Sequence, residues 1–258
     1  MPREARKKSK TKIYHIMWRG ANGQEIFHDD EDRLAFLDTI MKYKKRMGLK
    51  VFAWCLMSNH VHLLIKEGDE SISTTMKRIG VCFVSHYNWK YRTRGHLFQD
   101  RFRSENVETD QYLRTVVRYI HQNPVKAKMV DEVQQWKWSS CNGYYGVKVY
   151  PQKLLDPDFI LGLFSKDRTQ AMELFKEFNE RRNDDQCLDD HHYVRRLSDE
   201  EVRTEIKRVL GRMEIAHVKT LSRIHRTAIL REIKKVEGVS QKQVARILGI
   251  SVNLVYKA

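Results

Sequence analysis

Two histidines separated by one residue, His60 and His62, are the first group in the sequence that suggests chemistry. The segment from His60 to Lys66 (HVHLLIK) has the apolar composition of a strand. Side chains at positions i and i+2 of a strand leave the same face, so both imidazoles can converge on one ion. A solvated or hydrogen-bonded histidine pair is the alternative interpretation. The spacing therefore indicates a metal site only in combination with other groups.

A tyrosine and an asparagine four residues apart form the second group. Tyr119 and Asn123 lie in RYIHQNP, near the end of a stretch of helical period that begins at Asp110. Residues four apart share a helical face, which suits Tyr119 as a nucleophile and the amide oxygen of Asn123 as a third, hard metal ligand. His121 points to nearly the opposite side. A role for Tyr119 in the core, and Tyr112 as the nucleophile two turns earlier, remain alternatives.

Seven segments must fold together to position these groups, and they alternate between strand composition and helical period. In chain order they cover residues 12–19, 30–47, 51–57, 60–66, 71–92, 95–107 and 110–123. The last helix is expected to stop before Pro124, because the residue before a proline disfavours helical geometry. The order β-α-β-β-α-β-α predicts an α+β fold, a ferredoxin-like split β-α-β unit with an added C-terminal helix. Its antiparallel sheet should carry helices on one face.

The chain has an excess of positive charge. It contains 48 Lys and Arg against 33 Asp and Glu, a formal net charge of +15 at pH 7. This charge attracts a polyanion and favours the release of its counterions, so nucleic acid is the expected partner. Trp89 lies among basic and aromatic residues in HYNWKYRTRGH, a composition that suits binding of single-stranded DNA. Burial of Trp89 in the hydrophobic core is an equally compatible interpretation. Four arginines are the candidate contacts to single-stranded DNA: Arg92, Arg94, Arg101 and Arg103.

Cysteine spacing and hydropathy argue against two classes of protein. The four cysteines lack paired spacing, as expected for reduced thiols. No apolar run reaches membrane-spanning length, and the basic N-terminal segment is not followed by the apolar stretch of a signal peptide. We therefore expect a cytoplasmic protein without a membrane partner.

Three blocks of sequence, taken together, resemble one protein family. MSNHVHLLI, GHLFQDRFRSE and YIHQNPVKAKMV, in this order within about residues 10–147, resemble the HUH single-strand transposases, particularly the REP-associated tyrosine transposases. Matched residue by residue, His60 and His62 fall on the metal-binding histidines of that family. Tyr119 falls on its nucleophile and Asn123 on its third metal ligand.

The resemblance implies a specific reaction on single-stranded DNA that forms hairpins. A divalent ion, Mg²⁺ or Mn²⁺, polarises the scissile phosphate, and Tyr119 attacks to give a 5′-phosphotyrosine linkage and a free 3′-OH. Attack by another 3′-OH then rejoins strands. Two other functions are compatible with the same residues: a non-catalytic DNA-binding regulator on a transposase scaffold, and a metal-dependent DNA hydrolase that forms no covalent intermediate. The sequence leaves the oligomeric state open.

The C-terminal segment VSQKQVARILGISVNLVYKA predicts a helix-turn-helix. Ala245, Gly249 and Val255 have the spacing of a small residue at the helix crossing, the glycine of the turn and an apolar residue that seats the second helix. Three polar residues are then candidate contacts to duplex DNA: Ser251, Asn253 and Lys257.

The chain is expected to divide into three parts. Residues 1–150 form the α+β DNA transposase domain. Residues 151–196 form a helical connector that ends in the acidic linker at 183–192 (NDDQCLDDHH). Residues 197–258 form a small all-α helix-turn-helix domain.

Overall fold

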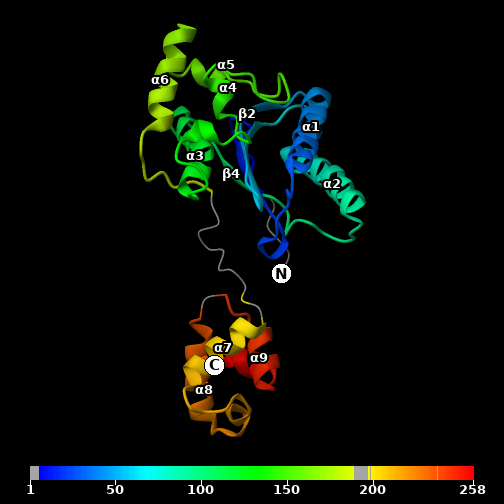
Figure 1. Cartoon of the computed structure of the whole chain (residues 1–258), viewed down its shortest axis with the longest axis vertical. Coiled ribbons are helices and arrows are strands. Elements are labelled where there is room, and N and C mark those ends of the chain that lie inside the picture. The colour runs from blue at the N-terminus through cyan, green and yellow to red at the C-terminus, as the bar shows by residue number, and fades with distance from the viewer. Residues whose placement is uncertain (1–5, 189–196, 198, 237) are drawn as a thin grey trace. The chain divides into compact units, whose positions relative to one another are not determined.

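The computed structural model describes residues 6–188, 197, 199–236 and 238–258, and it divides the chain into two compact units, Met1–Asp189 and Asp190–Ala258 (Figure 1). Each unit has a hydrophobic core of its own. Within the described residues, no helix is both long and apolar enough to cross a membrane.

The first unit is built on a four-stranded sheet with the order β2-β3-β1-β4. The strands are β1 (Ile13–Arg19), β2 (Lys50–Leu56), β3 (His60–Lys66) and β4 (Arg103–Asn106). All neighbouring strands pair antiparallel, with β1 between β3 and β4. The expected α+β fold with an antiparallel sheet is thereby confirmed.

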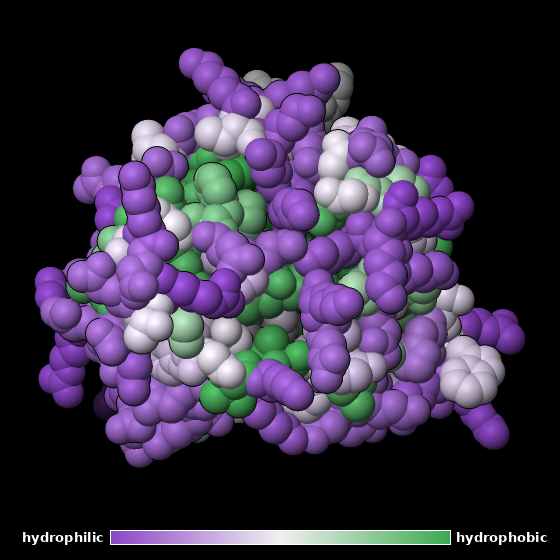
Figure 2. Space-filling view, turned by 90° about the horizontal axis from the view of Figure 1, so that it is seen from above, coloured by the Kyte–Doolittle hydropathy of each residue, from purple (hydrophilic) through white to green (hydrophobic). Residues whose placement is uncertain are grey.

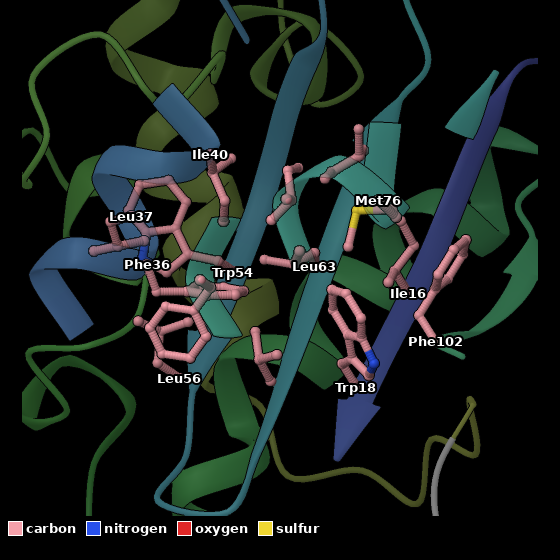
Figure 3. Packing of buried hydrophobic residues seen from close by; sticks show 14 of the residues in the cluster. Ile16, Trp18, Phe36, Leu37, Ile40, Trp54, Leu56, Leu63, Met76 and Phe102 are labelled. Atoms are coloured by element: carbon pink, nitrogen blue, oxygen red, sulfur yellow. The ribbon is translucent and has the colours of Figure 1, made fainter. Parts of the chain in front are cut away.

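Helices cover both faces of this sheet, because both faces are apolar. On one face, Ile16, Trp18 and Leu63 pack against α1 (Asp30–Met47) and α2 (Ile72–Tyr91), as Figure 3 shows. On the other, Leu64 and Ala53 pack with α3 (Asp110–Lys126). The expectation of helices on one face therefore holds for α1 and α2 but is wrong for α3.

The ends of α1 follow from its flanking residues. The side chain of Asp29 accepts a hydrogen bond from the backbone N–H of Asp32, whose carboxylate accepts in return from the N–H of Asp29. This capping box satisfies backbone donors that a helix leaves unpaired at its start. Gly48 ends the helix in the left-handed conformation, with φ of 66°. The helix spans the 30–47 expected from the sequence.

Two segments differ from the expected elements. Of the strand expected at 95–107, only residues 103–106 pair as a strand, and Phe98 adds an isolated bridge to Gly20. The side chains of Leu97 and Phe98 are buried in the core beside Trp18. Helix α3 continues through Pro124 to Lys126. The missing N–H of Pro124 falls in the last turn and its ring is buried, so packing overrides the local preference for a stop at Asn123.

The chain after residue 150 belongs to the first unit. Asp156 accepts hydrogen bonds from Lys44 Nζ (2.6 Å) and from the backbone N–H of Val51 (2.8 Å). Three helices follow α3 in this unit: α4 (Cys141–Tyr144), α5 (Asp158–Leu161) and α6 (Arg168–Glu180). The structure therefore does not divide at the expected residue 150, and its one division, between Asp189 and Asp190, lies near the second expected boundary at residue 196.

Residues 181–188, which we call the strap, lie along α3 instead of forming a free linker. Asp185 accepts two hydrogen bonds from the guanidinium of Arg118, at 2.7 and 2.9 Å, and both side chains are largely buried. Asn183 Nδ2 donates to Gln122 Oε1 at 2.7 Å. The rest of the acidic linker expected at 183–192 lies outside the described residues.

The second unit is helical within its described residues. Its elements are α7 (Asp199–Leu210), the 3₁₀ segment Ile215–Thr220, α8 (Arg223–Lys234), α9 (Gln241–Leu248) and α10 (Val252–Lys257). Gly249 ends α9 with φ of 65°, and Ala245 and Val255 are buried. Ser251 caps α10 by accepting from the N–H of Leu254. Two helices thus lie at the predicted positions, and DNA binding by them stays a prediction.

The surface of the first unit is mostly hydrophilic on the face seen from above, with apolar groups visible in hollows between polar side chains (Figure 2). The apolar faces of the sheet and helices are instead turned inward, into the two clusters on either side of the sheet.

Close packing of α2 on the sheet depends on Gly80. A Cβ atom at this position would lie 2.1 Å from Cη2 of the Trp18 indole. We predict that Gly80→Ala lowers the free energy of unfolding by about 1–3 kcal/mol, because the indole cannot move without disturbing the core. The measurement is urea unfolding followed by tryptophan fluorescence, which reports on the first unit because all five tryptophans lie in it.

The matched control is Val81→Ala, on the next residue of the same helix, whose side chain is 64% exposed. This substitution should change stability by less than about 0.5 kcal/mol. Equal effects of the two substitutions would contradict the packing argument.

Candidate active site

The strand β3 brings His60 and His62 to one face of the sheet. Their ring centroids are 5.2 Å apart. His62 is fully buried, whereas His60, at the start of the strand, is half-buried. The two imidazoles therefore lie together at the end of β3, as the i, i+2 spacing predicts.

The hydrogen bonds of Asn59 assign the proton of His60. Asn59 Nδ2 donates to the carbonyl oxygen of Gly23 at 3.3 Å, so its Oδ1 is the acceptor on the other side of the amide. That Oδ1 lies 2.7 Å from His60 Nδ1, an arrangement that favours the proton on Nδ1. In the neutral ring of this tautomer the lone pair is on Nε2.

A third histidine, His15 of β1, lies against His62. The antiparallel pairing places His15 opposite Leu64 and His62 opposite Met17, so the two rings are diagonal neighbours on one face. His15 Nε2 is 3.1 Å from His62 Nδ1, and both side chains are fully buried. Sequence reasoning missed His15. The signal was a histidine at an inward position of an apolar strand.

Burial and charge both act on His62. Its removal from water, and then the nearby His60 and His15, lower its pKa well below the usual value of 6.5. His62 is therefore neutral near pH 7. Its Nε2 atom is buried and has no hydrogen-bond partner among the described residues. A buried nitrogen of this kind is unusual and points to a missing ligand.

Tyr119 lies over the two buried histidines. It is only 1% exposed, and its ring centroid is 5.8 Å from those of His15 and His62, edge-on to each. Lys126, two turns further along α3, holds its Nζ atom 4.7 Å from the centre of the Tyr119 ring. The structure therefore brings the predicted nucleophile to the predicted histidine pair.

Asn123 follows Tyr119 by one turn of α3 and is largely buried. Its Nδ2 atom donates to the backbone carbonyl of Tyr119 at 3.1 Å. The amide nitrogen thus bonds to its own helix, which leaves the amide oxygen for another partner.

Tyr112, the alternative nucleophile, is held by other groups. Its hydroxyl donates to Glu105 Oε2 at 2.6 Å. Burial and this carboxylate raise its pKa well above 10. A phenol held as a donor to a carboxylate is a poor nucleophile, because loss of its proton would place two negative charges together.

The predicted arginines form two groups, and none of them lies in the core. Arg103 of β4 pairs with Met17, which pairs with His62, so Arg103 shares the face of the histidines at two strand spacings, roughly 10 Å. Arg101 is exposed but precedes β4, so the two arginines are not on one strand as predicted. Arg92 and Arg94 are exposed at the end of α2. Trp89 is 79% exposed, which removes the core alternative.

His121 is a structural group on the other side of α3. Its Nδ1 lies 3.1 Å from Asn179 Oδ1 and its Nε2 lies 2.8 Å from Ser140 Oγ, all buried. Burial lowers its pKa from 6.5 to about 4, although the hydrogen bond with Asn179 opposes the shift.

The lowered pKa of His121 makes stability depend on pH. Because the unfolded chain takes up this proton at about 6.5 and the folded protein only at about 4, the stability is complete above pH 6.5 and falls as the pH decreases to 4. The loss amounts to about 3 kcal/mol. We predict that His121→Gln removes this part of the pH dependence, measured by urea unfolding from pH 7 to 4. An unchanged slope in the variant would contradict the assignment.

Comparison with known proteins shows which family this chain resembles. Residues 8–123 match the model of the family described as "Transposase IS200 like". The chain is 27% identical over 114 residues to the REP-associated tyrosine transposase of Escherichia coli (strain K12). This alignment covers 43% of this chain and 66% of that protein. It is 27% identical over 135 residues to the putative REP-associated tyrosine transposase of Haemophilus influenzae, covering 48% and 74% respectively. The chain thus spans about two thirds of the length of the first relative.

A solved structure shares the fold. A REP-associated tyrosine transposase bound to a REP hairpin superposes with a TM-score of 0.50 and 22% identity, covering 60% of this chain and 94% of that chain. The segment that matches the family model includes His60, His62 and Tyr119. The segment 8–123 of this chain is therefore similar in sequence to the IS200-like transposases and shares a fold with a solved member of the REP-associated type.

Proposed function

We propose that this chain acts in DNA transposition by cleaving and rejoining single-stranded DNA through a 5′-phosphotyrosine linkage at Tyr119. The observation that carries the proposal is the contact of the Tyr119 ring with His62, at 5.8 Å between centroids. It supports Tyr119 as the nucleophile, because its ring lies beside the histidine pair in a segment that matches a transposase family. The hairpin named for the solved relative supports hairpin-forming single strands as the substrate.

The residues present fit a divalent ion, Mg²⁺ or Mn²⁺. His62 Nε2 is a buried nitrogen without a partner, and the proton of His60 on Nδ1 leaves its Nε2 able to bind a metal. No cluster of three or more His, Cys, Asp or Glu side chains suited to a metal occurs among the described residues. We propose the amide oxygen of Asn123 as the third ligand, with DNA oxygens and water completing the set.

When bound, such an ion supplies a positive charge that polarises the scissile phosphate and stabilises the leaving oxygen. Tyr119 Oη loses its proton to water and forms the new bond to phosphorus, while the bond to the 3′ oxygen breaks and that oxygen takes up a proton to leave as the 3′-OH. The diester energy is kept in the phosphotyrosine, so attack by a free 3′-OH rejoins the strand. The ammonium of Lys126 above the ring stabilises the negative charge that develops on the phenol oxygen.

DNA must displace a cover to reach Tyr119. This side chain is only 1% exposed, and Lys126 Nζ over its ring also donates to the carbonyl oxygen of Asp185 in the strap, at 3.1 Å. In the proposed reaction, Lys126 exchanges this carbonyl for a phosphate of the incoming strand. The exchange uncovers the nucleophile where the substrate is bound.

The second unit is proposed to bind duplex DNA through α10. Asn253 and Lys257 are exposed there and suit base and phosphate contacts. Ser251 caps the helix, so its role is to position the N-terminal turn of α10 as well as to contact DNA.

The covalent step predicts an adduct that depends on Tyr119. The full chain is incubated with Mn²⁺ and a labelled hairpin oligonucleotide that has single-stranded flanks, and a denaturing gel detects protein-linked DNA. Tyr119→Phe should form no detectable adduct, because the attacking oxygen is absent. Tyr112→Phe is the matched control and should keep the adduct, since its hydroxyl is bonded to Glu105.

Other outcomes separate the alternatives. Cleavage that survives Tyr119→Phe would indicate a hydrolase without a covalent intermediate. Wild-type protein that binds the oligonucleotide without cutting it would indicate a regulator. Loss of the adduct in Tyr112→Phe alone would move the nucleophile to that residue.

Metal binding is predicted to depend on His15 although it is not a ligand. If His62 donates its Nδ1 proton to His15 Nε2, its Nε2 lone pair faces the ion. We expect His15→Phe to weaken Mn²⁺ binding about 10- to 100-fold in calorimetry without DNA. His15→Gln, which retains an acceptor, should lose less. His60→Ala should abolish both Mn²⁺ binding and cleavage while sparing DNA binding.

Tryptophan fluorescence in urea checks that each of these variants folds. Wild-type Mn²⁺ affinity in a folded His15→Phe protein would show that His15 does not orient His62.

A further inference from the structure

We propose that a cleft between α2 and residues 95–102 holds an unpaired base of the DNA strand. The inference rests on the proposed function, because it takes single-stranded DNA to be the substrate. The cleft lies on the sheet face opposite Tyr119 and has a volume of about 1060 Å³. It contains no residue of the histidine site.

The inner surface of the cleft is apolar. Its floor includes Trp18, which is stacked on Phe98 with 4.0 Å between centroids and 15° between planes, and Phe102 lies beside it, as seen in Figure 3. One wall is formed by Val81 and Val84 of α2. Val81 is 64% exposed, so a large apolar group stands in water at the opening. A base that left the stack would bury its apolar surface here.

Cations surround this apolar surface. Arg6, Lys77 and Arg101 line the cleft together with a single carboxylate, that of Asp100. Arg6 is held in place, because its guanidinium lies 3.7 Å from the centre of the Phe102 ring and donates to Ser73 Oγ at 3.0 Å. Aromatic and aliphatic walls with cations at the rim are the arrangement that single-strand binding sites use.

A second groove connects the cleft with the face of the histidines. This groove has a volume of about 680 Å³, follows the β4 edge, and shares Arg6 and Arg101 with the cleft. It also includes Lys7 and Arg103. Because Arg103 is in register with His62 across β1, the basic path leads from the cleft toward the candidate active site.

The continuity of this path favours DNA over an acidic peptide as the ligand. The cations would also attract an acidic peptide, but nothing in such a peptide requires a path that continues to the histidines. In a DNA strand, the phosphates can follow Arg101 and Arg103 while one base enters the cleft. The segment 95–102 is fixed to β1 by the hydrogen bond from Gln99 N to the carbonyl oxygen of Arg19, at 2.9 Å. Arg19 in turn pairs with His60.

The test compares two hairpin oligonucleotides that differ only in their single-stranded flanks. One has ordinary bases there, and the other has abasic sites, which keep the phosphates. Binding is measured by fluorescence anisotropy at one salt concentration with the full chain. We expect wild-type protein to bind the ordinary flank about tenfold more tightly, because stacking and burial of a base are lost from the abasic one.

Val81→Glu should abolish this tenfold preference, because a carboxylate at the opening repels the phosphates and keeps water in the cleft. Val147→Glu is the matched control, since Val147 is also exposed (56%) in the same unit and lines neither groove. It introduces the same charge and should keep the preference. Tryptophan fluorescence in urea checks the fold of both variants.

A preference that survives Val81→Glu, or a wild-type protein without any preference, would overturn the cleft assignment. The phosphotyrosine assay is read separately. If wild-type protein forms no adduct while Val81→Glu removes the preference, the proposed function fails and the cleft stands. If the adduct forms and the preference survives Val81→Glu, the cleft assignment fails and the proposed function stands.

Discussion

The antiparallel pairing of β1 with β3 determines where every group of the candidate site lies. It makes His15 and His62 diagonal neighbours, close enough for a bond of 3.1 Å between ring nitrogens. A shift of this pairing by one residue would turn His62 toward the cluster of Trp18 and away from α3. The register is held because both faces of β1 are buried, so that a shift would misplace each of its side chains.

The same pairing explains how the sheet offers two separate surfaces to the proposed functions. Side chains of β1 and β3 point alternately to the two faces of the sheet. One set packs in the core under α1 and α2, and the other lies on the face that contacts Tyr119 of α3. The proposed chemistry occupies the second face and the proposed base cleft the first. The β4 edge joins them, because Arg103 belongs to the histidine face while Phe102, next to it, belongs to the other. A thin sheet can therefore present two surfaces to one strand of DNA.

Local patterns in the sequence predicted most of the elements and the candidate residues that the structure brings together. The caps of α1 and the i, i+2 spacing of His60 and His62 depend on neighbours in the chain, and such information is complete in the sequence. Tyr119 and Asn123 are likewise one turn apart in any helix. The family match agrees with the resemblance found in these blocks.

What the sequence could not show depends on contacts between distant residues. His15 is an isolated histidine in an apolar strand, and only the register with β3 reveals its partner. Asp185 appeared to belong to an acidic linker, but Arg118, 67 residues earlier, draws it onto α3. Residues 95–102 have strand composition, yet they contribute only an isolated bridge between Phe98 and Gly20, while Phe98 stacks on Trp18. In each case tertiary packing decides between local states of similar energy.

The two edges of the sheet are finished in different ways. The chain itself covers β2, where Leu155 and Ser139 form bridges with Val51 and Cys55. The edge at β4 is only four residues long and has the sequence RSEN, without an apolar side chain. A short, charged edge is a poor template for a strand of another protein, so the molecule resists aggregation there without a cover. Backbone and basic groups along that edge thus stay accessible to a nucleic acid. A nucleic acid binds through its phosphates and does not need the row of backbone hydrogen bonds that a pairing strand forms.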